Sequence, residues 1–436
     1  MPRILIDGYN LGLEKGTGVA TYARNLSYEI GNLGHQIDVL YGNRAGMTRD
    51  EFLREIYFFD TGVDERGRLL KIFDQAQQAV HGPLTFRAKE IPVTGRVITR
   101  TFESRLPRFD RLFNSTDLFS RARSAFNLWG RPSKIRLPEK PDLAHWTYPI
   151  PLHVKGRPNL YTLHDLVPLR LPYSTLDHKR RYLKLLKRLD KSAAHFVTVS
   201  ENSKRDLVDL VGIAPERITN TYQSVDIPAK YRDKSEDQVA REVEGLTGFD
   251  YKGYFLFWGS LEPKKNIGRI IEAYLSSQVD TPLVIVGAQA WKADQELKLL
   301  GDTGSFYGGL ERRRGARKRV IQMPYASFPL LVSLIRGAKG ALFPSLYEGF
   351  GLPVLEAMLL GTPVICSNTS SLPEVAGDAA LVVDPYDTQA ITQAIRAMDA
   401  DADLRAQHVA AGEKQAAKFT PEIYRDRLKT VYDRFL

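Results

Sequence analysis

Two glutamates eight positions apart stand in the run Pro-Ser-Leu-Tyr-Glu-Gly-Phe-Gly-Leu-Pro-Val-Leu-Glu-Ala-Met, which covers residues 344–358. The Gly-Phe-Gly turn and the apolar residues after it predict a loop that carries Glu348 and a helix that carries Glu356 about one turn from its start. The free amides of that helix start, at Gly351 and Leu352, would face phosphate. Carboxylates accept hydrogen bonds from hydroxyl groups. The spacing therefore fits one glutamate on sugar hydroxyls and the other on a ribose.

A pair of lysines follows another predicted strand, in the run Phe-Trp-Gly-Ser-Leu-Glu-Pro-Lys-Lys-Asn at residues 257–266. A helix is expected to open at Asn266 or nearby, so Lys264 and Lys265 would stand at the top of a strand beside a helix N-terminus. Cations in that position hold a diphosphate well. The alternative is a solvated lysine pair without a ligand.

A histidine and an aspartate end a third predicted strand, in the run Tyr-Thr-Leu-His-Asp-Leu at residues 161–166. His164 and Asp165 would lie at the carboxyl end of the strand, where parallel sheets gather functional groups. The alternative is a structural histidine whose hydrogen bonds are satisfied within the fold.

A glycine-rich turn, Gly-Thr-Gly-Val-Ala-Thr-Tyr at residues 16–22, follows the first predicted strand. Gly16 and Gly18 would let the backbone approach an anion at the start of a helix. The third glycine of a dinucleotide fingerprint is absent, which argues against an NAD enzyme. A purely structural tight turn is the alternative.

Short apolar runs alternate with helical patterns along most of the chain, as is typical of βα units in parallel sheets. The candidate strands cover residues 3–7, 37–41, 160–163, 196–200, 254–258, 283–286, 341–344 and 363–366. The pattern occurs twice and breaks around residues 226–248. We therefore expect an α/β fold with two doubly wound, Rossmann-like domains, at residues 1–226 and 227–415, and a ligand cleft between them.

The positive charge of the chain is concentrated in one segment. The 436 residues include 61 Lys and Arg against 51 Asp and Glu, a formal net charge of +10, and residues 86–140 alone hold 13 basic and 5 acidic side chains. The aromatic residues interleaved with these charges are Phe102, Phe109, Phe113, Phe119, Phe126 and Trp129. This mixture suits an amphipathic surface on anionic lipid headgroups, or an insertion whose rings dock on the core. A second basic stretch, at residues 178–189, places Leu183, Leu186 and Leu189 at helical spacing beneath a cationic face.

Several classes of protein are excluded by what the sequence lacks. No stretch of about 18 apolar residues predicts a membrane span, and the N-terminus lacks the apolar core of a signal peptide. The single cysteine, Cys366, argues against a disulfide-linked scaffold and against a cysteine zinc site, so we expect a cytoplasmic protein. Asp399, Asp401 and Asp403 follow a helical stretch, so we interpret them as a polar helix terminus and expect no metal site there.

The motifs resemble those of the retaining glycosyltransferases of family 4, and in particular those of their bacterial mannosyltransferase-B-like branch. That branch shows strings such as Thr-Ile-His-Asp-Leu-Ile-Pro-Leu, Gly-Thr-Leu-Glu-Pro-Arg-Lys-Asn and Pro-Ser-Leu-Tyr-Glu-Gly-Phe-Gly-Leu-Pro. This chain has Thr-Leu-His-Asp-Leu-Val-Pro-Leu at residues 162–169, Gly-Ser-Leu-Glu-Pro-Lys-Lys-Asn at residues 259–266, and the third string unchanged at residues 344–353. The resemblance covers residues 3–40 and about 143–430.

The resemblance implies the GT-B architecture and a catalytic role for four residues. Glu348 would bind hydroxyls of the donor sugar, and Lys265 would neutralise the diphosphate. His164 would face the sugar and phosphates from the N-terminal domain, and Asp165 would orient His164 or help the acceptor. The last helix, within residues 416–436, would cross back onto the N-terminal domain.

The resemblance also implies a set of donor-binding residues. Those expected to contact the nucleotide sugar are Gly16, Gly18, Ser260, Lys264, Lys265, Glu348, Phe350, Gly351, Leu352 and Glu356, with Glu356 on the ribose. Many family members carry an arginine where this chain has Ser260, so Lys264 or another basic residue would supply the second charge. Residues 45–140 have no clear counterpart in the branch, which leaves acceptor recognition open.

The implied activity is retaining transfer of mannose from GDP-mannose to a lipid-linked or polysaccharide acceptor in bacterial surface glycan synthesis, without a metal or another cofactor. The open alternatives are a UDP-sugar donor, a glycogen synthase-like or phosphorylase-like enzyme, and a nucleic-acid-binding protein. The last would explain residues 86–140 but neither glutamate. The expected partners are the donor, the acceptor and, through residues 86–140, the anionic cytoplasmic face of the inner membrane, and not nucleic acid.

Overall fold

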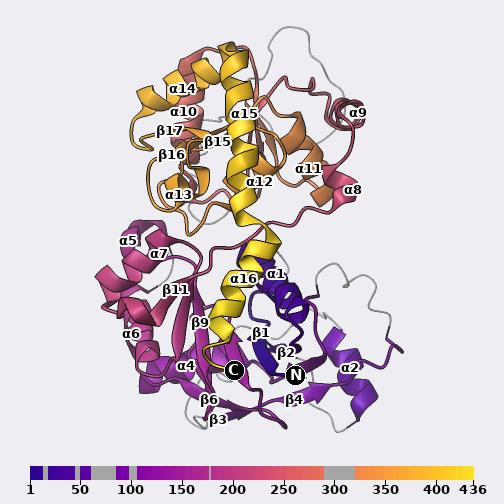
Figure 1. The fold of residues 1–436 in the computed structure, drawn as a ribbon, viewed down its shortest axis with the longest axis vertical. Coiled ribbons are helices and arrows are strands. Elements are labelled where there is room, and N and C mark those ends of the chain that lie inside the picture. Colours follow the sequence, from indigo (N-terminus) through magenta and orange to yellow (C-terminus); the bar gives the residue numbers. More distant parts are fainter. Residues whose placement is uncertain (13–17, 45–49, 60–84, 98–105, 176–177, 289–319) are drawn as a thin grey trace, which may run out of the picture. The chain divides into compact units, whose positions relative to one another are not determined.

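The chain folds into two compact units in a computed structural model (Figure 1). The structure describes residues 1–12, 18–44, 50–59, 85–97, 106–175, 178–288 and 320–436. The first unit comprises Met1–Leu169, Asp177–Ser224 and Pro421–Leu436, and the second comprises Arg170–Leu176 and Val225–Thr420.

An eight-stranded sheet forms the centre of the first unit, in the order β11-β10-β9-β7-β1-β2-β5-β4. Its strands are β1 (Arg3–Asp7), β2 (Gln36–Tyr41), β4 (Lys89–Ile91), β5 (Arg111–Asn114), β7 (Leu143–Trp146), β9 (Asn159–Leu163), β10 (His195–Thr198) and β11 (Ile218–Asn220). All neighbours run parallel except β4, which is antiparallel to β5. A small parallel sheet contains β3 (Thr85–Arg87), β6 (Ser133–Arg136) and β8 (Leu152–Val154). Central strands such as β7 and β9 are buried throughout, which is why they consist largely of apolar residues.

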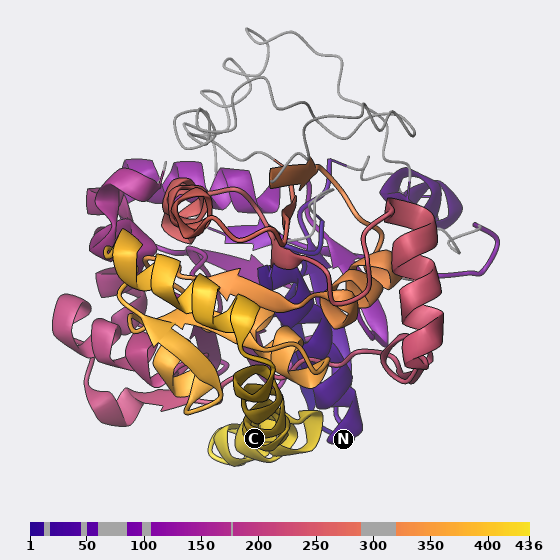
Figure 2. The same cartoon turned by 90° about the horizontal axis from the view of Figure 1, so that it is seen from above.

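Helices flank this sheet. Those of the N-terminal half and the C-terminal segment are α1 (Gly18–Asn32), α2 (Glu51–Phe59), α4 (Leu118–Trp129), α5 (Val167–Arg170), α6 (Lys179–Asp190), α7 (Glu201–Asp206) with the π-helical turn η2 (Leu207–Val211), η3 (Pro215–Arg217) and α16 (Pro421–Tyr432). The C-terminal helix α16 packs beside α1 (Figures 1 and 2). An ion pair of 2.6 Å joins Arg425 of α16 to Glu29 of α1. The end of the described chain is therefore part of the first unit.

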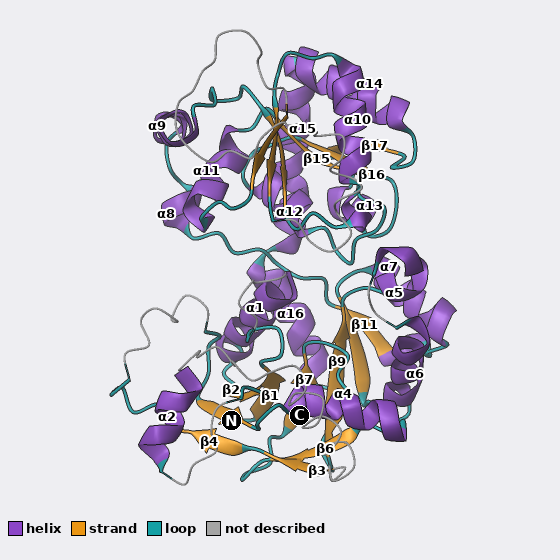
Figure 3. Ribbon diagram, turned by 180° about the vertical axis from the view of Figure 1, so that it is seen from behind, coloured by secondary structure: helices purple, strands orange, loops and turns teal. Residues whose placement is uncertain are grey.

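A six-stranded, wholly parallel sheet forms the second unit, in the order β14-β13-β12-β15-β16-β17. Its strands are β12 (Phe255–Trp258), β13 (Leu283–Val286), β14 (Val320–Met323), β15 (Gly340–Phe343), β16 (Val364–Ser367) and β17 (Ala380–Val383). Its helices and turns are η1 (Pro172–Ser174), α8 (Ala229–Arg232), α9 (Glu236–Thr247), η4 (Pro263–Lys265), α10 (Ile267–Ser277), α11 (Phe328–Gly337), α12 (Leu352–Leu359), α13 (Leu372–Ala376), α14 (Thr388–Ala400), α15 (Ala402–Ala416) and η6 (Ala417–Phe419). Figure 3 shows this sheet nearly edge-on, with α9 and α11 on one side and α10 and α14 on the other.

The predicted fold class, α/β with two Rossmann-like units, is confirmed. All eight strands expected from the sequence are present, and each end lies within two residues of the expected position. The remaining strands have three or four residues each, and the sequence pattern did not reveal them.

The described parts of residues 86–140 do not form an irregular insertion. They include β5, which lies inside the main sheet beside β2, and α4, whose apolar face packs on the core. The rings of Phe113, Phe119 and Phe126 are at most 8% exposed, so they dock on the core and cannot form a lipid-binding surface. Phe109 is half-buried and Trp129 is 57% exposed, while Phe102 lies outside the described residues.

Part of the basic charge of this segment is neutralised within the sheet. Arg111 on β5 contacts both carboxylate oxygens of Asp38 on β2 at 2.9 and 3.0 Å and lies 2.7 Å from Glu139. The count of charges along the sequence therefore overstates the cationic surface of residues 86–140.

Candidate functional site

The loop that carries Lys264 and Lys265 and the loop that carries Glu348 meet at the carboxyl ends of the strands in the six-stranded sheet. Strands β12 and β15 pair in parallel, so the loops that follow them leave the sheet on the same side. Two hydrogen bonds tie the loops together. The Leu346 N–H donates to the Lys264 carbonyl over 2.8 Å, and the Asn266 side-chain amide donates to the Pro344 carbonyl over 2.9 Å.

Lys265 and Glu348 form an ion pair at this edge. Lys265 Nζ lies 2.6 Å from Glu348 Oε1, and the two side chains are 12% and 10% exposed. Burial raises the pKa of the Glu348 carboxyl, but the charges of Lys265 and Lys264, with hydrogen bonds from Lys265 and Ser345, outweigh burial and lower the pKa overall. The glutamate is therefore ionised at neutral pH, and it is balanced by a cation of the kind that a diphosphate requires.

Glu356 lies in α12 and is held by Trp258, the last residue of β12. The indole Nε1–H of Trp258 donates to Glu356 Oε2 over 2.8 Å. Burial raises the pKa of Glu356, and the Trp258 hydrogen bond and the charge of Lys265 oppose that shift only in part. The sequence motifs do not single out Trp258, although its place at a strand end is the signal that could have found it.

The start of α12 offers two backbone donors. Gly351 has φ = 110°, which favours glycine, and a Cβ at this position would stand 2.6 Å from Leu372 Cδ2. Among the described residues, none accepts a hydrogen bond from the N–H groups of Gly351 and Leu352. Helix N-terminal amides of this kind bind phosphate.

Phe350 lies in the loop between Glu348 and the start of α12. Its ring is buried and packs edge-on against Phe419, with ring centroids 5.6 Å apart. Ser371 Oγ donates hydrogen bonds to the carbonyls of Glu348 and Phe350, at 3.0 and 2.8 Å, and so fixes the loop between them. The ring of Phe350 therefore supports the loop, and only its backbone can meet a ligand.

The backbone of the loop after β12 passes close to the residue that follows β13. A Cβ at Gly287, just after β13, would stand 1.9 Å from the Gly259 carbonyl oxygen. Ser260 is exposed, and Lys264 is half-buried with its Nζ 4.0 Å from Glu262 Oε2. Because the charge of Lys264 helps to lower the pKa of Glu348, it adds positive potential at the same edge.

His164 and Asp165 follow β9 in the first unit. His164 Nε2 lies 2.9 Å from the Thr147 carbonyl oxygen, and a carbonyl can only accept, so Nε2 carries the proton. The Tyr22 ring lies edge-on to the imidazole, with centroids 4.7 Å apart. Asp165 Oδ1 accepts a hydrogen bond from the Val167 N–H over 3.3 Å, at the start of α5.

Asp7, at the end of β1, holds the residue to which His164 binds. Its fully buried carboxylate accepts hydrogen bonds from the Thr147 N–H over 2.5 Å and from the Tyr9 N–H over 3.2 Å. Burial raises the pKa of Asp7 to about 6 against the effect of these hydrogen bonds. Asp7, Thr147 and His164 thus form one chain that positions the imidazole. The sequence motifs do not single out Asp7, although it ends a predicted strand.

A second buried series of hydrogen bonds links the C-terminal helix α16 to β9, the strand that His164 follows. Tyr22 Oη lies 2.9 Å from Thr162 Oγ1, which lies 2.8 Å from His145 Nε2, and His145 Nδ1 lies 2.7 Å from Tyr432 Oη. Burial lowers the pKa of His145 to about 3, so the imidazole is neutral. These contacts connect α1, β9, β7 and α16 two residues before His164.

The glycine-rich turn is described in part. Gly18 is the exposed first residue of α1, one turn before Tyr22, so it lies in the same region of the first unit as His164. Gly16 lies outside the described residues.

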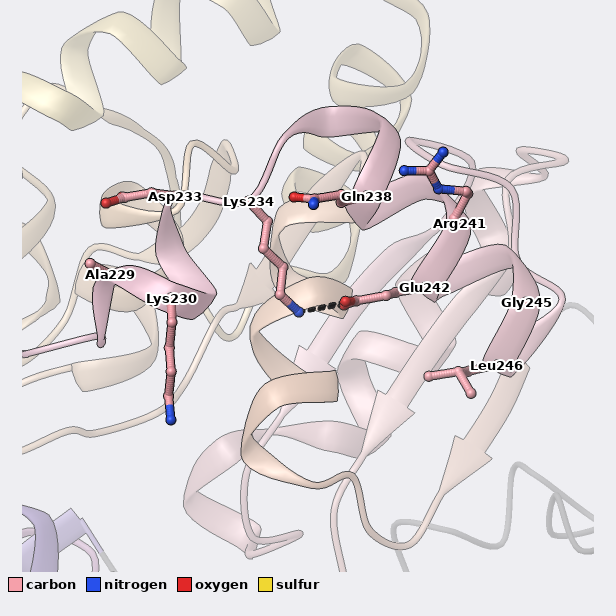
Figure 4. Close-up of a pocket in the computed structure, with 9 residues that line it drawn as sticks. All are labelled: Ala229, Lys230, Asp233, Lys234, Gln238, Arg241, Glu242, Gly245 and Leu246. Atoms are coloured by element: carbon pink, nitrogen blue, oxygen red, sulfur yellow. Dashed lines mark hydrogen bonds and ion pairs between the residues drawn. The ribbon is translucent and has the colours of Figure 1, made fainter.

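A groove elsewhere in the second unit contains none of the predicted site residues. It has a volume of about 870 Å³ and is lined by side chains of α8, α9 and the connection between them (Figure 4). The Lys234–Glu242 ion pair of 2.6 Å spans it. Lys234 already has an acidic partner in Glu242, and none of the strand-end residues lines this groove.

Two of the three aspartates near residue 400, Asp399 and Asp401, have structural partners. Asp401 caps α15 by accepting a hydrogen bond from the Leu404 N–H over 2.9 Å, and Asp399 pairs with Lys339 at 2.5 Å. Within the described ranges, no three His, Cys, Asp or Glu side chains gather closely enough to hold a metal ion.

In the part of the chain that the structure describes, no helix is both long enough and apolar enough to cross a bilayer.

Comparison with known proteins gives two family matches in chain order. Residues 16–227 match the family described as "Glycosyltransferase Family 4", and residues 246–415 match "Glycosyl transferases group 1". The O-antigen chain mannosyltransferase B of Escherichia coli is 34% identical over 267 residues, 60% of this chain and 66% of that protein. The MMP alpha-(1->4)-mannosyltransferase of Mycolicibacterium hassiacum is 25% identical over 89% of this chain and 87% of that protein.

Solved structures show the same fold over the whole chain. Sucrose-phosphate synthase from Thermosynechococcus elongatus superposes with a TM-score of 0.65 at 17% identity, covering 100% of this chain and 99% of that one. The chain spans just under two thirds of the first mannosyltransferase and about a third of the serotype-specific mannosyltransferase WbdA of Escherichia coli. The order of the two matches and the GT-B fold agree, and the chain belongs to glycosyltransferase family 4, in its mannosyltransferase-like branch.

Proposed function

We propose that this chain is a retaining, metal-independent hexosyltransferase that moves mannose from GDP-mannose onto a lipid-linked or polysaccharide acceptor in bacterial surface glycan synthesis. It would act in the cytoplasm, peripheral to the inner membrane. The observation that carries the proposal is the Lys265–Glu348 pair of 2.6 Å, together with the backbone amides of Gly351 and Leu352, which have no acceptor among the described residues. The names of the two mannosyltransferases described above support mannose as the sugar.

The geometry suits a reaction in which negative charge grows on the leaving diphosphate. Lys265 Nζ and the two amides would stabilise that charge most where it develops, in the transition state. In the proposed step, the bond from the anomeric carbon to the phosphate oxygen breaks while the acceptor oxygen bonds to the same face of the sugar. The acceptor proton passes to the leaving phosphate. His164 and Asp165 are assigned to the sugar and acceptor side of the reaction.

The donor would have to separate an existing ion pair. Without a donor, Lys265 and Glu348 satisfy each other. A diphosphate would take over the ammonium group, and sugar hydroxyls would take over the carboxylate, which accepts but cannot donate hydrogen bonds. A complete nucleotide sugar offers a new partner to both Lys265 and Glu348, whereas a free nucleotide offers one to Lys265 only.

The test is calorimetric titration of the wild type with GDP, UDP, ADP and a dinucleotide, repeated with Lys265→Ala. The matched control is Lys339→Ala, which removes an ammonium group from a Lys–carboxylate pair of 2.5 Å in the same unit. Lys339 directly precedes β15, whereas Lys265 and Glu348 follow their strands, so the control lies at the opposite edge of the sheet. A charge-assisted hydrogen bond is worth roughly a 10- to 150-fold change in affinity, and we expect that loss for GDP only in Lys265→Ala.

The other outcomes separate the alternatives. Binding of UDP alone would overturn the assignment of GDP-mannose as the donor and would leave the transferase assignment standing. Binding of no nucleotide by the folded wild type would overturn the proposed function. Phosphate-dependent glucan breakdown would indicate a phosphorylase-like enzyme, and salt-dependent DNA binding would indicate a nucleic-acid-binding protein.

A further inference from the structure

One helix of the first unit presents a wholly cationic outer face. In α6, Leu186 and Leu189 are buried against the core, with Tyr182, Leu183 and Leu185 packed beside them. At 100° per residue the opposite side of the helix spans an arc of roughly 120°. The exposed residues on that arc are Arg180, Arg181, Lys184, Lys187, Arg188 and Lys191, of which Lys191 directly follows the helix.

The described part of the chain gives this face no acidic partner. Among the residues that the structure describes, none forms an ion pair with any of these six cations. The first turn of α6 contains no acidic residue, and His178 before it provides no side-chain cap. Cations at a helix N-terminus oppose the helix dipole, so the fold tolerates a local electrostatic cost that an external anion would remove.

An exposed apolar pair stands next to this face. Leu128 and Trp129, the last residues of α4, are 56% and 57% exposed. They precede Gly130, where an added Cβ would stand 2.8 Å from Lys184 Nζ. Figures 1 and 3 both show α4 and α6 side by side. Lys184 of the cationic face therefore lies beside the end of α4, and the six cations and this pair together are here named the α4–α6 surface.

We propose that the α4–α6 surface docks the first unit on an anionic bilayer. The cations would lie at the headgroup phosphates, and the Trp129 ring would enter the interfacial layer, where tryptophan is enriched. The use of this surface rests on the proposed transfer to a lipid-linked acceptor. It differs from the membrane contact expected from residues 86–140, because most of the described aromatic rings of that segment are buried and only its Leu128–Trp129 end takes part.

The combination of charge and apolar side chains favours a bilayer over other anionic partners. Attraction to an anionic leaflet needs cations on one face, and anchoring needs a side chain that enters the acyl boundary. The α4–α6 surface supplies both on adjacent helices. A duplex nucleic acid would use the cations but would leave Leu128 and Trp129 exposed to water.

The experiment is vesicle co-sedimentation of the full chain. The vesicles contain phosphatidylcholine with or without phosphatidylglycerol, at low and at high salt. The test variant is Lys184→Gln/Lys187→Gln/Arg188→Gln, since glutamine keeps good helix propensity. The charge-matched control is Lys230→Gln/Arg241→Gln/Lys414→Gln, which removes three exposed cations of the second unit. Trp129→Ser tests the apolar part separately.

We expect the wild type and the control to bind the anionic vesicles at low salt and to release them at high salt. Each cation near an anionic leaflet strengthens binding roughly fivefold, so the test variant should bind about 100-fold more weakly. Trp129→Ser should weaken binding several-fold. Equal binding by the test variant and the wild type would overturn the proposal. So would equal wild-type binding to uncharged vesicles, or binding to duplex DNA without binding to vesicles.

Nucleotide titration of the same variants separates this proposal from the proposed function. A test variant that binds GDP normally but not vesicles supports the α4–α6 surface. A wild type that binds vesicles but no nucleotide keeps this surface and overturns the transferase assignment.

Discussion

Removal of the Lys265 ammonium group should expose the cost of burying Glu348. In the Lys265→Ala variant, a glutamate side chain that is 10% exposed loses its partner at 2.6 Å. Breaking a buried pair in this way costs roughly 3–5 kcal/mol of unfolding free energy. Lys264 still acts on Glu348, so we expect the lower end, about 3 kcal/mol. For a unit of this size that corresponds to a fall of roughly 6–12 °C in Tm.

The pH dependence gives the sharper test. In the wild type the pKa of Glu348 is lowered below its ordinary value of 4.5, so its stabilising contribution is present at neutral pH and is lost as the pH falls through that lowered pKa. Without Lys265 the effect of burial is opposed less, and the pKa should rise. The penalty in the variant is then present at neutral pH and disappears as acid protonates the carboxyl. The gap in stability between wild type and variant should therefore narrow as the pH falls from about 7.5 to about 5.

Scanning calorimetry across this pH range measures the gap, and hydrogen exchange assigns it to the second unit. Adding Glu348→Gln to Lys265→Ala removes the unpaired charge and should restore about 2 kcal/mol. The control Lys339→Ala breaks a more exposed pair and should cost no more than about 1 kcal/mol. A gap that does not change with pH, or a double variant as unstable as Lys265→Ala, would refute the reasoning.

Three further variants test the buried groups. Asp7→Asn removes a carboxyl whose pKa is raised to about 6, so ionisation destabilises the wild type as the pH rises through that value. In urea titrations, the unfolding free energy of the variant should rise by about 2 kcal/mol relative to that of the wild type between about pH 4.5 and 7.5. The same difference in unfolding free energy at both pH values would contradict this. Trp258→Phe removes the donor to Glu356 and should cost about 2 kcal/mol and weaken GDP binding in calorimetry, whereas unchanged affinity would argue against a ribose role. Tyr432→Phe leaves His145 Nδ1 without its partner and should destabilise the first unit by about 2 kcal/mol in denaturant unfolding, a loss that must be measurable if the bond contributes.

The fold was predictable where the chain forms buried parallel strands. Such strands are apolar on both faces, so runs such as residues 3–7 and 283–286 stand out and match β1 and β13 to the residue. The strand Arg111–Asn114 was missed because only two of its four residues are apolar, and they stand between an arginine and an asparagine. That arginine is neutralised by Asp38 on the neighbouring strand, and a contact between residues so far apart in sequence leaves no local pattern.

The candidate site was predictable as a set of residue types but not as a set of contacts. Motif spacing indicated Lys265 and Glu348, yet it could not show that they pair with each other. Asp7 and Trp258 are single residues at strand ends, and neither has a local signature. Their roles follow from long-range hydrogen bonds, to Thr147 and to Glu356, which only the folded sheets create.

The packing of α16 on the first unit sets the order in which the chain can complete its folding during synthesis. Roughly 200 residues separate the end of β11 from the start of α16, which at ribosomal rates corresponds to roughly 10–40 s. During that interval His145 lacks the Tyr432 hydroxyl, and the surface that Tyr424, Leu428 and Val431 later cover is open to water. Almost all of the second unit, Val225–Thr420, emerges within the same interval. The unit that leaves the ribosome first is therefore the last to be finished.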